Sequence, residues 1–587
     1  MIKTKLKNII SSRYPDVDFD VLIPPDGKMG DYSVNIAFIL AKKYRRNSEE
    51  VGEEIIKEIG RGGDIQKVFG RIEFVKPGFI NFYFNEGFLR EQLKEISNDK
   101  NFGFNKTMKG KTVMVEYTDP NPFKLFHIGH LMSNTMGEAI ARLYEASGAK
   151  VLRANYQGDV GLHAAKTIWA ILGPAKNGFT EENDLLEKRM KYLGEAYTIG
   201  AQSYEENEET KTRIEEINKK IYDRSDESIN RVYDLGKKWS LEYFETIYKK
   251  LGTKFEHYFF ESETGRDGLK IINQNRKVFT ESEGALIFKG GDHGLHNRVF
   301  VNAKGLPTYE AKELGLNKKK FDLYSPDLSI IITGNEINDY FKVVLKVMEL
   351  VMPEIAKKTY HIGHGMMRFS SGKMSSRTGN VITAESLIEQ VISKIKMKEK
   401  ETESASEKTE KEYESLAVSA IKYMILKHNI GSDIVFDFER ALSIKGDAAP
   451  YLQYTYARLR SIGRNSRKIN RLSVRFAASG FAIPSWVWGL GVDLSKLTEE
   501  KELTLIKHIL NFPDIVGESA KTHNINDLAL YLYGLATRAN NYYENVRILD
   551  GKIEMSRRNA RLLLVEIAAR TLKRGLNLLG IETLEKI

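Results

Sequence analysis

The fold is decided by residues 111–158, KTVMVEYTDPNPFKLFHIGHLMSNTMGEAIARLYEASGAKVLRANYQG. Residues 112–117 are mostly β-branched and apolar, as in a buried strand, and residues 131–147 repeat apolar side chains at helical spacing until Gly148. A second strand-like run begins at Val151. Strand, helix and strand in this order form a βαβ unit. The unit predicts a parallel sheet with a ligand crevice at the carboxyl ends of its strands.

The remaining segments predict further domains around this unit. Strand-like runs at 71–75 and 79–84 alternate with helical periodicity near the start of the chain, and almost everything after Leu416 has helical period. We therefore predict a multidomain protein. Its parts are an α+β domain over 1–105, an α/β Rossmann-type domain over 106–385 with a helical insertion at about 173–280, linker and stem helices over 386–445, and an all-α domain over 446–587.

The composition bounds the function. The chain has 587 residues, 42% of them hydrophobic, which excludes wholesale disorder, and it has no cysteine. Disulfides, thiolate-held zinc or iron–sulfur sites and a cysteine nucleophile are therefore excluded. No apolar run reaches the roughly 18 residues that span a bilayer, so we expect a cytoplasmic protein without a membrane partner. The net charge of +10 is a mild excess, compatible with a nucleic-acid partner.

The first motif is His127-Ile128-Gly129-His130, at the start of the predicted helix 131–147. A helix N-terminus presents unpaired N–H groups, so two imidazoles there can serve phosphate oxygens while Gly129 leaves room for a purine ring. The same tetrapeptide recurs at 361–364, where it does not follow the first strand of a βαβ unit. We interpret the second copy as coincidental and expect residues 364–367 to be a strand end that shapes the pocket wall.

The second motif is GKMSSRTGN at residues 372–380. Glycines flank a lysine and several hydroxyls, which suits a loop closing ammonium, O–H and N–H donors around a triphosphate. A solvated turn of the same composition is an equally good interpretation of this segment alone.

Taken together and in this order, the two motifs resemble the two signatures of class I aminoacyl-tRNA synthetases. Residues 116–124, EYTDPNPFK, and 155–161, NYQGDVG, resemble the arginyl-tRNA synthetase form of that catalytic domain. Further segments are similar to the same family, namely 30–33, 77–82, 307–309, 451–458 and 578–581. The resemblance identifies residues 1–105 as an added tRNA-binding domain and 446–587 as an anticodon-binding domain.

The resemblance implies that arginine and ATP form arginyl-adenylate, and that the arginyl group passes to the 3′-terminal adenosine of tRNA(Arg). It implies catalytic roles for His127, His130 and Lys373, and ATP binding by these three with Gly129, Met374, Ser375 and Ser376. The implied partners are tRNA(Arg), L-arginine and ATP with Mg²⁺ as its counter-ion. We expect no zinc and a monomer. Lys124 is a further candidate phosphate cation.

The implied arginine-binding residues are Glu116, Asp119, Asn121, His130, Tyr309, Glu313 and Glu336. A buried guanidinium has five N–H donors and needs carboxylate acceptors. The chain departs from the family at Glu313, where Asp is usual, and at residues 335–339, where the family has a Gln. The alternative is that Glu310 and Glu313 form an exposed helical pair beside Lys312.

For tRNA, the resemblance points to Phe79 and Asn81, which would read an unstacked loop base, and to Asn540 and Tyr543. Strand core for Phe79 and a turn for Asn81 are the alternatives. Other functions also stay open at this point: a class I synthetase for lysine or glutamate, a small-metabolite nucleotidyltransferase, and a non-catalytic tRNA-binding paralogue.

Overall fold

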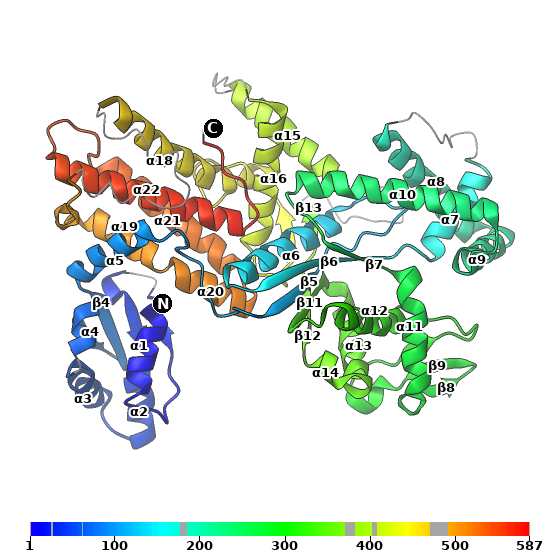
Figure 1. The fold of residues 1–587 in the computed structure, drawn as a ribbon, viewed down its shortest axis with the longest axis horizontal. Coiled ribbons are helices and arrows are strands. Elements are labelled where there is room, and N and C mark those ends of the chain that lie inside the picture. The colour runs from blue at the N-terminus through cyan, green and yellow to red at the C-terminus, as the bar shows by residue number, and fades with distance from the viewer. Residues whose placement is uncertain are drawn as a thin grey trace.

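The computed structural model describes residues 2–24, 27–61, 63–175, 185–369, 382–401, 408–469 and 491–585. In Figure 1, a central sheet lies between a largely helical C-terminal region and a group of inserted helices, and a separate small domain holds the N-terminus. The predicted multidomain architecture is confirmed.

The N-terminal domain is an antiparallel sheet covered by helices. Its strand order is β1-β2-β4-β3, formed by Val21–Leu22, Tyr32–Val34, Phe79–Phe84 and Phe69–Val75. Tyr32, Ile80 and Phe82 are fully buried and form its core with the apolar sides of the helices. These helices are α1 Ile2–Ser11, α2 Ile36–Tyr44, α3 Ser48–Gly60, α4 Gly63–Val68 and α5 Glu86–Asn98.

The central sheet is parallel, with strand order β12-β11-β5-β6-β7. Its strands are Thr359–His364, Leu328–Gly334, Thr112–Glu116, Lys150–Gln157 and His257–Phe260. Helix α6, Ile128–Ala146, connects β5 to β6, so the predicted βαβ unit is confirmed. Val113, Met114 and Val115 are all fully buried because both faces of the sheet are covered, which explains the continuous apolar run of β5.

The inserted helices follow α7, Leu162–Leu172, and are α8 Leu186–Glu206, α9 Glu208–Asp223 and α10 Glu227–Lys250. Because residues 257–260 already form β7 of the sheet, the helical insertion is shorter than the predicted 173–280. After β7 come α11 Glu261–Gln274, a small antiparallel sheet and α12 Tyr309–Tyr324. The small sheet, which the sequence did not predict, consists of β8 Thr280–Ser282, β9 Ala285–Phe288 and β10 Arg298–Val301.

Beyond β11, helices α13 Asn338–Val351 and α14 Pro353–Ala356 lead to β12, and the short strands β13 Met367–Phe369 and β14 Ile434–Phe436 pair in parallel. Residues 394–414, which are rich in lysine, glutamate, serine and threonine, form the end of α15, Ala384–Glu401, and the start of α16, Glu410–Leu426. Residues 402–407 lie outside the described part. The C-terminal helices are α17 Phe438–Ala441, α18 Ala449–Ile469, α19 Glu500–Leu510, α20 Phe512–Thr522, α21 Ile525–Asn545 and α22 Met555–Leu578.

Helix α6 joins the sheet to the C-terminal helices through a buried ionic network. Glu138 accepts a hydrogen bond from Tyr117 Oη at 2.7 Å and pairs with Arg142 at 2.6 Å and Arg153 at 2.8 Å. Arg142 in turn donates to the carbonyl oxygen of Asn577 at 2.8 Å. The carboxylate of Glu138 is thus fully paired in a region of low dielectric.

A second buried cation strengthens the same junction. Lys422 on α16 donates from Nζ to the carbonyl oxygens of Leu251 at 2.6 Å and Gly580 at 2.8 Å. Burial and the nearby Arg142 lower the pKa of Lys422 to about 7. The ammonium is satisfied by two carbonyl groups that come from distant parts of the chain.

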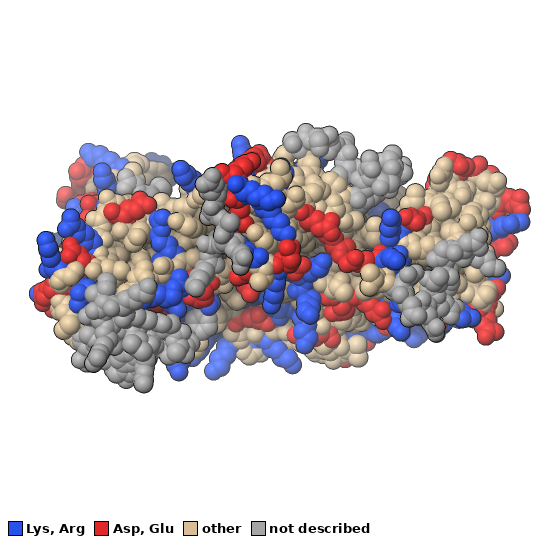
Figure 2. Space-filling model, turned by 90° about the horizontal axis from the view of Figure 1, so that it is seen from above, with Lys and Arg blue, Asp and Glu red and all other residues tan. Residues whose placement is uncertain are grey.

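Basic and acidic side chains are interspersed on the face shown in Figure 2. The excess of positive charge therefore does not form one broad patch on that face. None of the helices in the described ranges combines the length and apolarity needed to cross a bilayer.

Candidate active site

The two histidines of the first motif cap helix α6. His127 is the N-cap residue, and its Nδ1 accepts from the backbone N–H of Gly129 at 3.1 Å and of His130 at 3.4 Å. In return, Nδ1 of His130 accepts from the backbone N–H of His127 at 3.2 Å. The rings stack with centroids 3.6 Å apart. This reciprocal arrangement satisfies orphan donors at the helix start.

Burial keeps both rings uncharged, and the capping hydrogen bonds fix their tautomers. Burial and the nearby Lys124 lower the pKa of His127 to about 4, and burial with His127 lowers that of His130 well below its usual value. Both imidazoles are therefore neutral at pH 7, and because each Nδ1 accepts a hydrogen bond, each proton lies on Nε2. Two Nε2–H donors at a helix N-terminus can serve a phosphate or hydroxyl oxygen.

Lys124 lies close to this helix start. Its pKa is lowered by burial and by the charge of Lys166, and its own charge acts on His127, His130 and His163. Within the described ranges no carboxylate forms an ion pair with Lys124, whose ammonium lies 5.2 Å from the ring centroid of Tyr197. A half-buried cation without an anionic partner suits a phosphate group.

The second motif, residues 372–380, lies outside the described residues, as do Lys373, Met374, Ser375 and Ser376. The chain re-enters the described part directly against the first motif. The backbone N–H of Ile128 donates to Ile382 O at 3.3 Å, and His127 forms an isolated antiparallel bridge with Thr383. The end of the second motif is thus only a few residues from a backbone contact with the first.

The second His-Ile-Gly-His copy occupies the end of the edge strand β12, as predicted. His361 Nε2 shares a hydrogen bond of 2.7 Å with Thr333 Oγ1, and its ring stacks on Phe341 at 3.9 Å. His364 Nδ1 lies 2.7 Å from the carbonyl oxygen of Gly365. These rings have partners of their own on a strand and do not begin a helix.

Carboxylates gather at the carboxyl end of β5. Glu116 is buried and pairs with the equally buried Lys320 of α12 at 2.5 Å. Thr118 and Asp119 both have positive φ values, 84° and 46°, a rare pair of conformations for non-glycine residues. This turn points the Asp119 carboxylate at the backbone N–H of Tyr156, which donates at 2.8 Å. Burial and the charge of Glu116 raise the pKa of Asp119 well above its usual value.

Glu313 faces the same carboxylates from α12. Only 8% of it is exposed, and its Oε2 has no hydrogen-bond partner within the described residues. Burial and the charge of Glu116 raise its pKa to about 8. Glu310 and Lys312 are buried as well, and Glu310 lies 3.6 Å from Arg298, so the alternative of an exposed helical pair is wrong.

Glu261, the first residue of α11, adds a carboxylate that the sequence analysis missed. Its Oε2 accepts from Lys312 Nζ at 2.6 Å. A Cβ placed on Gly158 would lie 3.0 Å from Glu261 Oε1 and 2.3 Å from Asn121 Oδ1, so two oxygen acceptors converge on the open side of this glycine. The position of Glu261 directly after a strand of the sheet was the available signal, and it required recognition of β7.

The structure thus brings Glu116, Asp119, Asn121 and Glu313 into one neighbourhood. Tyr309, the first residue of α12, is 58% exposed, and its ring centroid lies 5.0 Å from Lys312 Nζ. Glu336 is different, because it is exposed beyond β11, where it lies against Gly334 and acts on His364.

The predicted tRNA residues differ in accessibility. Phe79 is half-buried at the start of β4, whereas Asn81 is buried and its Oδ1 accepts from Ser33 Oγ at 2.7 Å. Asn540 is also buried, donating to Thr455 Oγ1 at 2.8 Å between α21 and α18. Tyr543 is 39% exposed, and the guanidinium of Arg458 lies 5.2 Å from its ring centroid. Phe79 and Tyr543 are therefore the members of this set that can meet a base without rearrangement.

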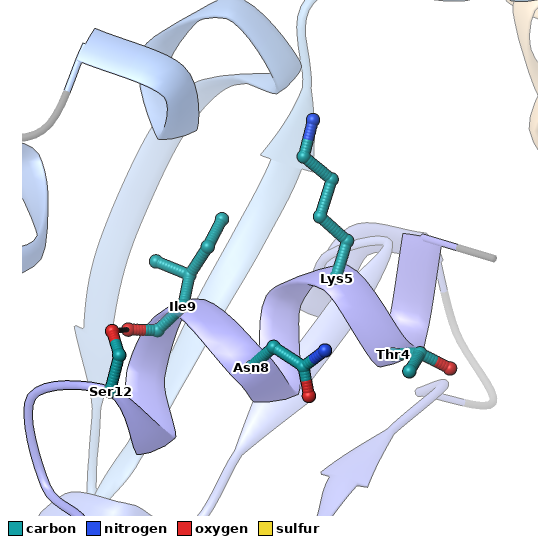
Figure 3. A pocket seen from close by; sticks show the side chains of 5 residues that line it. All are labelled: Thr4, Lys5, Asn8, Ile9 and Ser12. Carbon is teal, nitrogen blue, oxygen red and sulfur yellow. Dashed lines mark hydrogen bonds between the residues drawn. The ribbon is translucent and has the colours of Figure 1, made fainter.

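The described residues form a surface depression on α1, away from this site, but no metal-binding cluster. In the part of the chain that the structure describes, no group of three or more His, Asp or Glu residues is arranged to hold a metal ion. Figure 3 shows a depression formed by one side of α1, where Ser12 Oγ donates to Ile9 O at 2.8 Å. Its five lining residues all belong to the N-terminal domain.

Comparison with known proteins extends over the whole chain. The chain is 29% identical over 581 residues to the arginine–tRNA ligase of Fusobacterium nucleatum, covering 97% of this chain and 95% of the relative. It is 27% identical to that of Clostridium acetobutylicum, covering 99% and 100%. The structure of Thermus thermophilus arginyl-tRNA synthetase matches the fold with a TM-score of 0.80 at 24% identity, covering both chains completely.

Family models match three consecutive parts of the chain. Residues 1–84 match the arginyl tRNA synthetase N-terminal domain, and residues 452–587 match the DALR anticodon-binding domain. Residues 92–438 match the catalytic domain of class I (R) tRNA synthetases, which is more than half of the sequence. With the parallel sheet, the capped helix α6 and these matches, the chain belongs to the family of class I (R) tRNA synthetases.

Proposed function

We propose that this protein is an arginine–tRNA ligase, which converts L-arginine and ATP to arginyl-adenylate and pyrophosphate and then transfers the arginyl group to the 3′-terminal adenosine of tRNA(Arg). The curated relatives that bear this name match over nearly their whole length. The single observation that carries the choice of amino acid is the charge of the buried side chains that gather at the carboxyl end of β5, which we propose to line the amino-acid pocket.

This pocket contains more carboxylates than it has cations. Lys320 pairs with Glu116, and Lys312 pairs with Glu261, which leaves Asp119 and Glu313 without a lysine or arginine partner in the described structure. The raised pKa values of Asp119 and Glu313 have the same origin, since burial and neighbouring negative charge both penalise ionisation. Two uncompensated carboxylates match the guanidinium and the α-ammonium of arginine.

The charge of the pocket distinguishes arginine from glutamate and lysine, the other amino acids that the sequence left open. A glutamate side chain would bring a further anion among buried carboxylates, which is electrostatically unfavourable. Lysine has the same two positive charges, but its ammonium has three donors, whereas the planar guanidinium can meet carboxylate oxygens in pairs. The arginine–tRNA ligase relatives support arginine, and both histidines of the first motif argue against a non-catalytic paralogue.

In this proposal the nucleotide binds at the N-terminus of α6. The Nε2–H groups of His127 and His130 and the ammonium of Lys124 would contact ATP oxygens, and Gly129 would admit the adenine. Lys373, Met374, Ser375 and Ser376 remain predicted ATP residues, with Mg²⁺ as the counter-ion of the substrate. Catalysis would come from positioning the arginine carboxylate against the α-phosphorus and from stabilising the departing pyrophosphate.

For the amino acid, we propose that Glu313 and Tyr309 contact the guanidinium, while Glu116, Asp119, Asn121 and His130 line the rest of the pocket. Glu336 is retained only as a predicted residue, because it lies at the surface beside His364. For tRNA, we propose contacts from Phe79 in the N-terminal domain and from Tyr543 in the anticodon-binding domain, with Asn81 and Asn540 supporting them from within.

The test is amino-acid-dependent ATP–pyrophosphate exchange with each of the twenty amino acids, with and without total tRNA. We expect exchange only with arginine and only when tRNA is present, since a pocket completed by the RNA terminus would couple activation to the acceptor. Robust exchange with lysine or glutamate would refute the choice of arginine. Fractionation of cells and light scattering of the purified protein would test the proposed cytoplasmic location and monomeric state.

A further inference from the structure

Lys312 is a buried cation that links three separate elements. Its Nζ donates to Glu261 Oε2 of α11 at 2.6 Å and to Tyr222 Oη of α9 at 3.0 Å. The Lys312 side chain is 5% exposed and that of Glu261 is 9% exposed, so the pair lies in a region of low dielectric. An ammonium in such a place needs good acceptors, and Tyr222 supplies one of them.

Tyr222 belongs to the inserted helices and lies 90 residues before Lys312. The same helix, α9, makes a second contact with this part of the molecule, where Glu215 Oε2 lies 3.4 Å from Lys304 Nζ. That second pair is largely exposed, with 41% of Glu215 and 75% of Lys304 accessible. Besides packing on α7, helix α9 therefore makes one buried hydrogen bond to Lys312 and one surface ion pair with Lys304.

The buried contact determines how Glu261 presents its two oxygens. Because Oε2 is held by Lys312, Oε1 is the oxygen that faces the open side of Gly158, next to Asn121 Oδ1. If Lys312 moved, Glu261 would lose its counter-charge, and burial would favour the protonated acid. A protonated Glu261 would no longer offer a negative charge to a cationic substrate group.

We propose that Lys312 and Tyr222 are positioning residues of the amino-acid pocket, through which the inserted helix α9 sets the affinity for arginine. The inference rests on the proposed function. Tyr222 holds the Lys312 ammonium, and Lys312 holds the Glu261 carboxylate ionised and oriented toward the substrate. Neither residue contacts the nucleotide in this scheme, so the effect is confined to the amino acid.

The experiment uses the full-length protein with tRNA and measures kcat and the KM values for arginine and ATP by pyrophosphate exchange. Tyr222→Phe removes one acceptor from a charged donor and should raise the arginine KM about three- to tenfold. Lys312→Met should raise it about a hundredfold, and Lys312→Arg, which keeps the charge, should recover most of the loss. In all three, kcat and the ATP KM should stay within about twofold of the parent.

Lys304→Met is the matched control, because it removes the exposed contact of the same helix and should leave the arginine KM unchanged. Thermal unfolding checks that Tyr222→Phe is folded. An arginine KM for Tyr222→Phe equal to the parent value, or equal losses in arginine KM, ATP KM and kcat for Lys312→Met, would overturn the proposal. Absence of arginine-dependent exchange and of arginine binding in the parent would instead overturn the proposed function.

Discussion

Arginine binding should depend on pH through Glu313. The pKa of this buried carboxyl is raised to about 8 by burial and by Glu116, so at pH 7 it holds a proton in the free protein. The charges that act on it are those of Glu116, Lys320, Glu261 and Glu310. A guanidinium requires the ionised form, so binding must release this proton. The affinity for arginine should therefore rise with pH.

The size of the effect follows from the pKa. At pH 7, one unit below the pKa, ionising Glu313 costs about 1.4 kcal/mol, so the Kd for arginine should fall about tenfold between pH 7 and pH 9. Glu313→Gln keeps the shape but loses the charge-assisted bond, which is worth about 2–3 kcal/mol. The deficit of the variant should then be about 2–3 kcal/mol at pH 9 and only about 1 kcal/mol at pH 7.

Isothermal titration calorimetry measures both quantities, in the presence of a tRNA that cannot accept an amino acid. At pH 7, titrations in two buffers of different ionisation enthalpy should show proton release when arginine binds, and Glu313→Gln should release nearly one proton fewer than the parent. The α-amino group of the substrate titrates equally in both proteins, so it cancels in the comparison. A parent Kd that is the same at pH 7 and pH 9, or a variant with the parent pH dependence, would refute the reasoning.

Three further predictions concern other parts of the molecule. His130→Ala should lower kcat roughly a hundredfold, because its Nε2–H would act on charge developing in the transition state, while the arginine affinity should fall only modestly. His361→Ala, on β12, should keep the parent kcat, and equal sensitivity of the two variants would place the nucleotide elsewhere. Between about pH 4.5 and pH 8, Glu313 is ionised in the unfolded state but protonated in the folded state, so raising the pH favours unfolding. The Tm of the unliganded protein should therefore fall across this range by more than the Tm of Glu313→Gln. Identical Tm profiles would contradict the raised pKa. Tyr543→Ala should raise the KM for tRNA without changing the Tm. Asn540→Ala should instead lower the Tm, because it removes a buried hydrogen bond. A lower Tm for Tyr543→Ala would mean that its ring supports the fold and not tRNA binding.

The central sheet and α6 could be predicted because their periodicity is strong and local. β5 is a continuous apolar run, β6 begins within one residue of the predicted Val151, and α6 begins and ends at clear signals. β7 was missed because it has only four residues, and its place in the sheet depends on pairing with β6, about a hundred residues earlier. The small sheet β8–β10 was missed for a similar reason, since its strands are three or four residues long.

The first motif could be placed at a helix start, but the counter-charges of the pocket could not. Helix α12 has four lysines in its sixteen residues, a composition typical of a solvated helix, and yet Lys312 and Lys320 are buried. The burial of Lys312 depends on how closely α11 packs, which Gly268 permits because a Cβ there would lie 1.9 Å from the carbonyl oxygen of Ala311, whereas Lys320 is buried against Glu116 of β5. Such packing is a tertiary property that no local pattern contains. For Asn81 and Asn540, the residue type could be read from the sequence, but whether the side chain faces the core or the surface could not, and both are buried.

The buried junction of α6 with the C-terminal helices has a consequence for the order in which the protein can mature during synthesis. Arg142 and Lys422 are made early, but their carbonyl acceptors at Asn577 and Gly580 leave the ribosome 435 and 158 residues later. Until then Arg142 has Glu138 as its partner within α6, but Lys422 has only the carbonyl oxygen of Leu251. Helix α16 therefore cannot close on α6 without burying a Lys422 Nζ that lacks one of its two acceptors. A nascent chain therefore completes its catalytic half only after the segment around residues 577–580 has emerged.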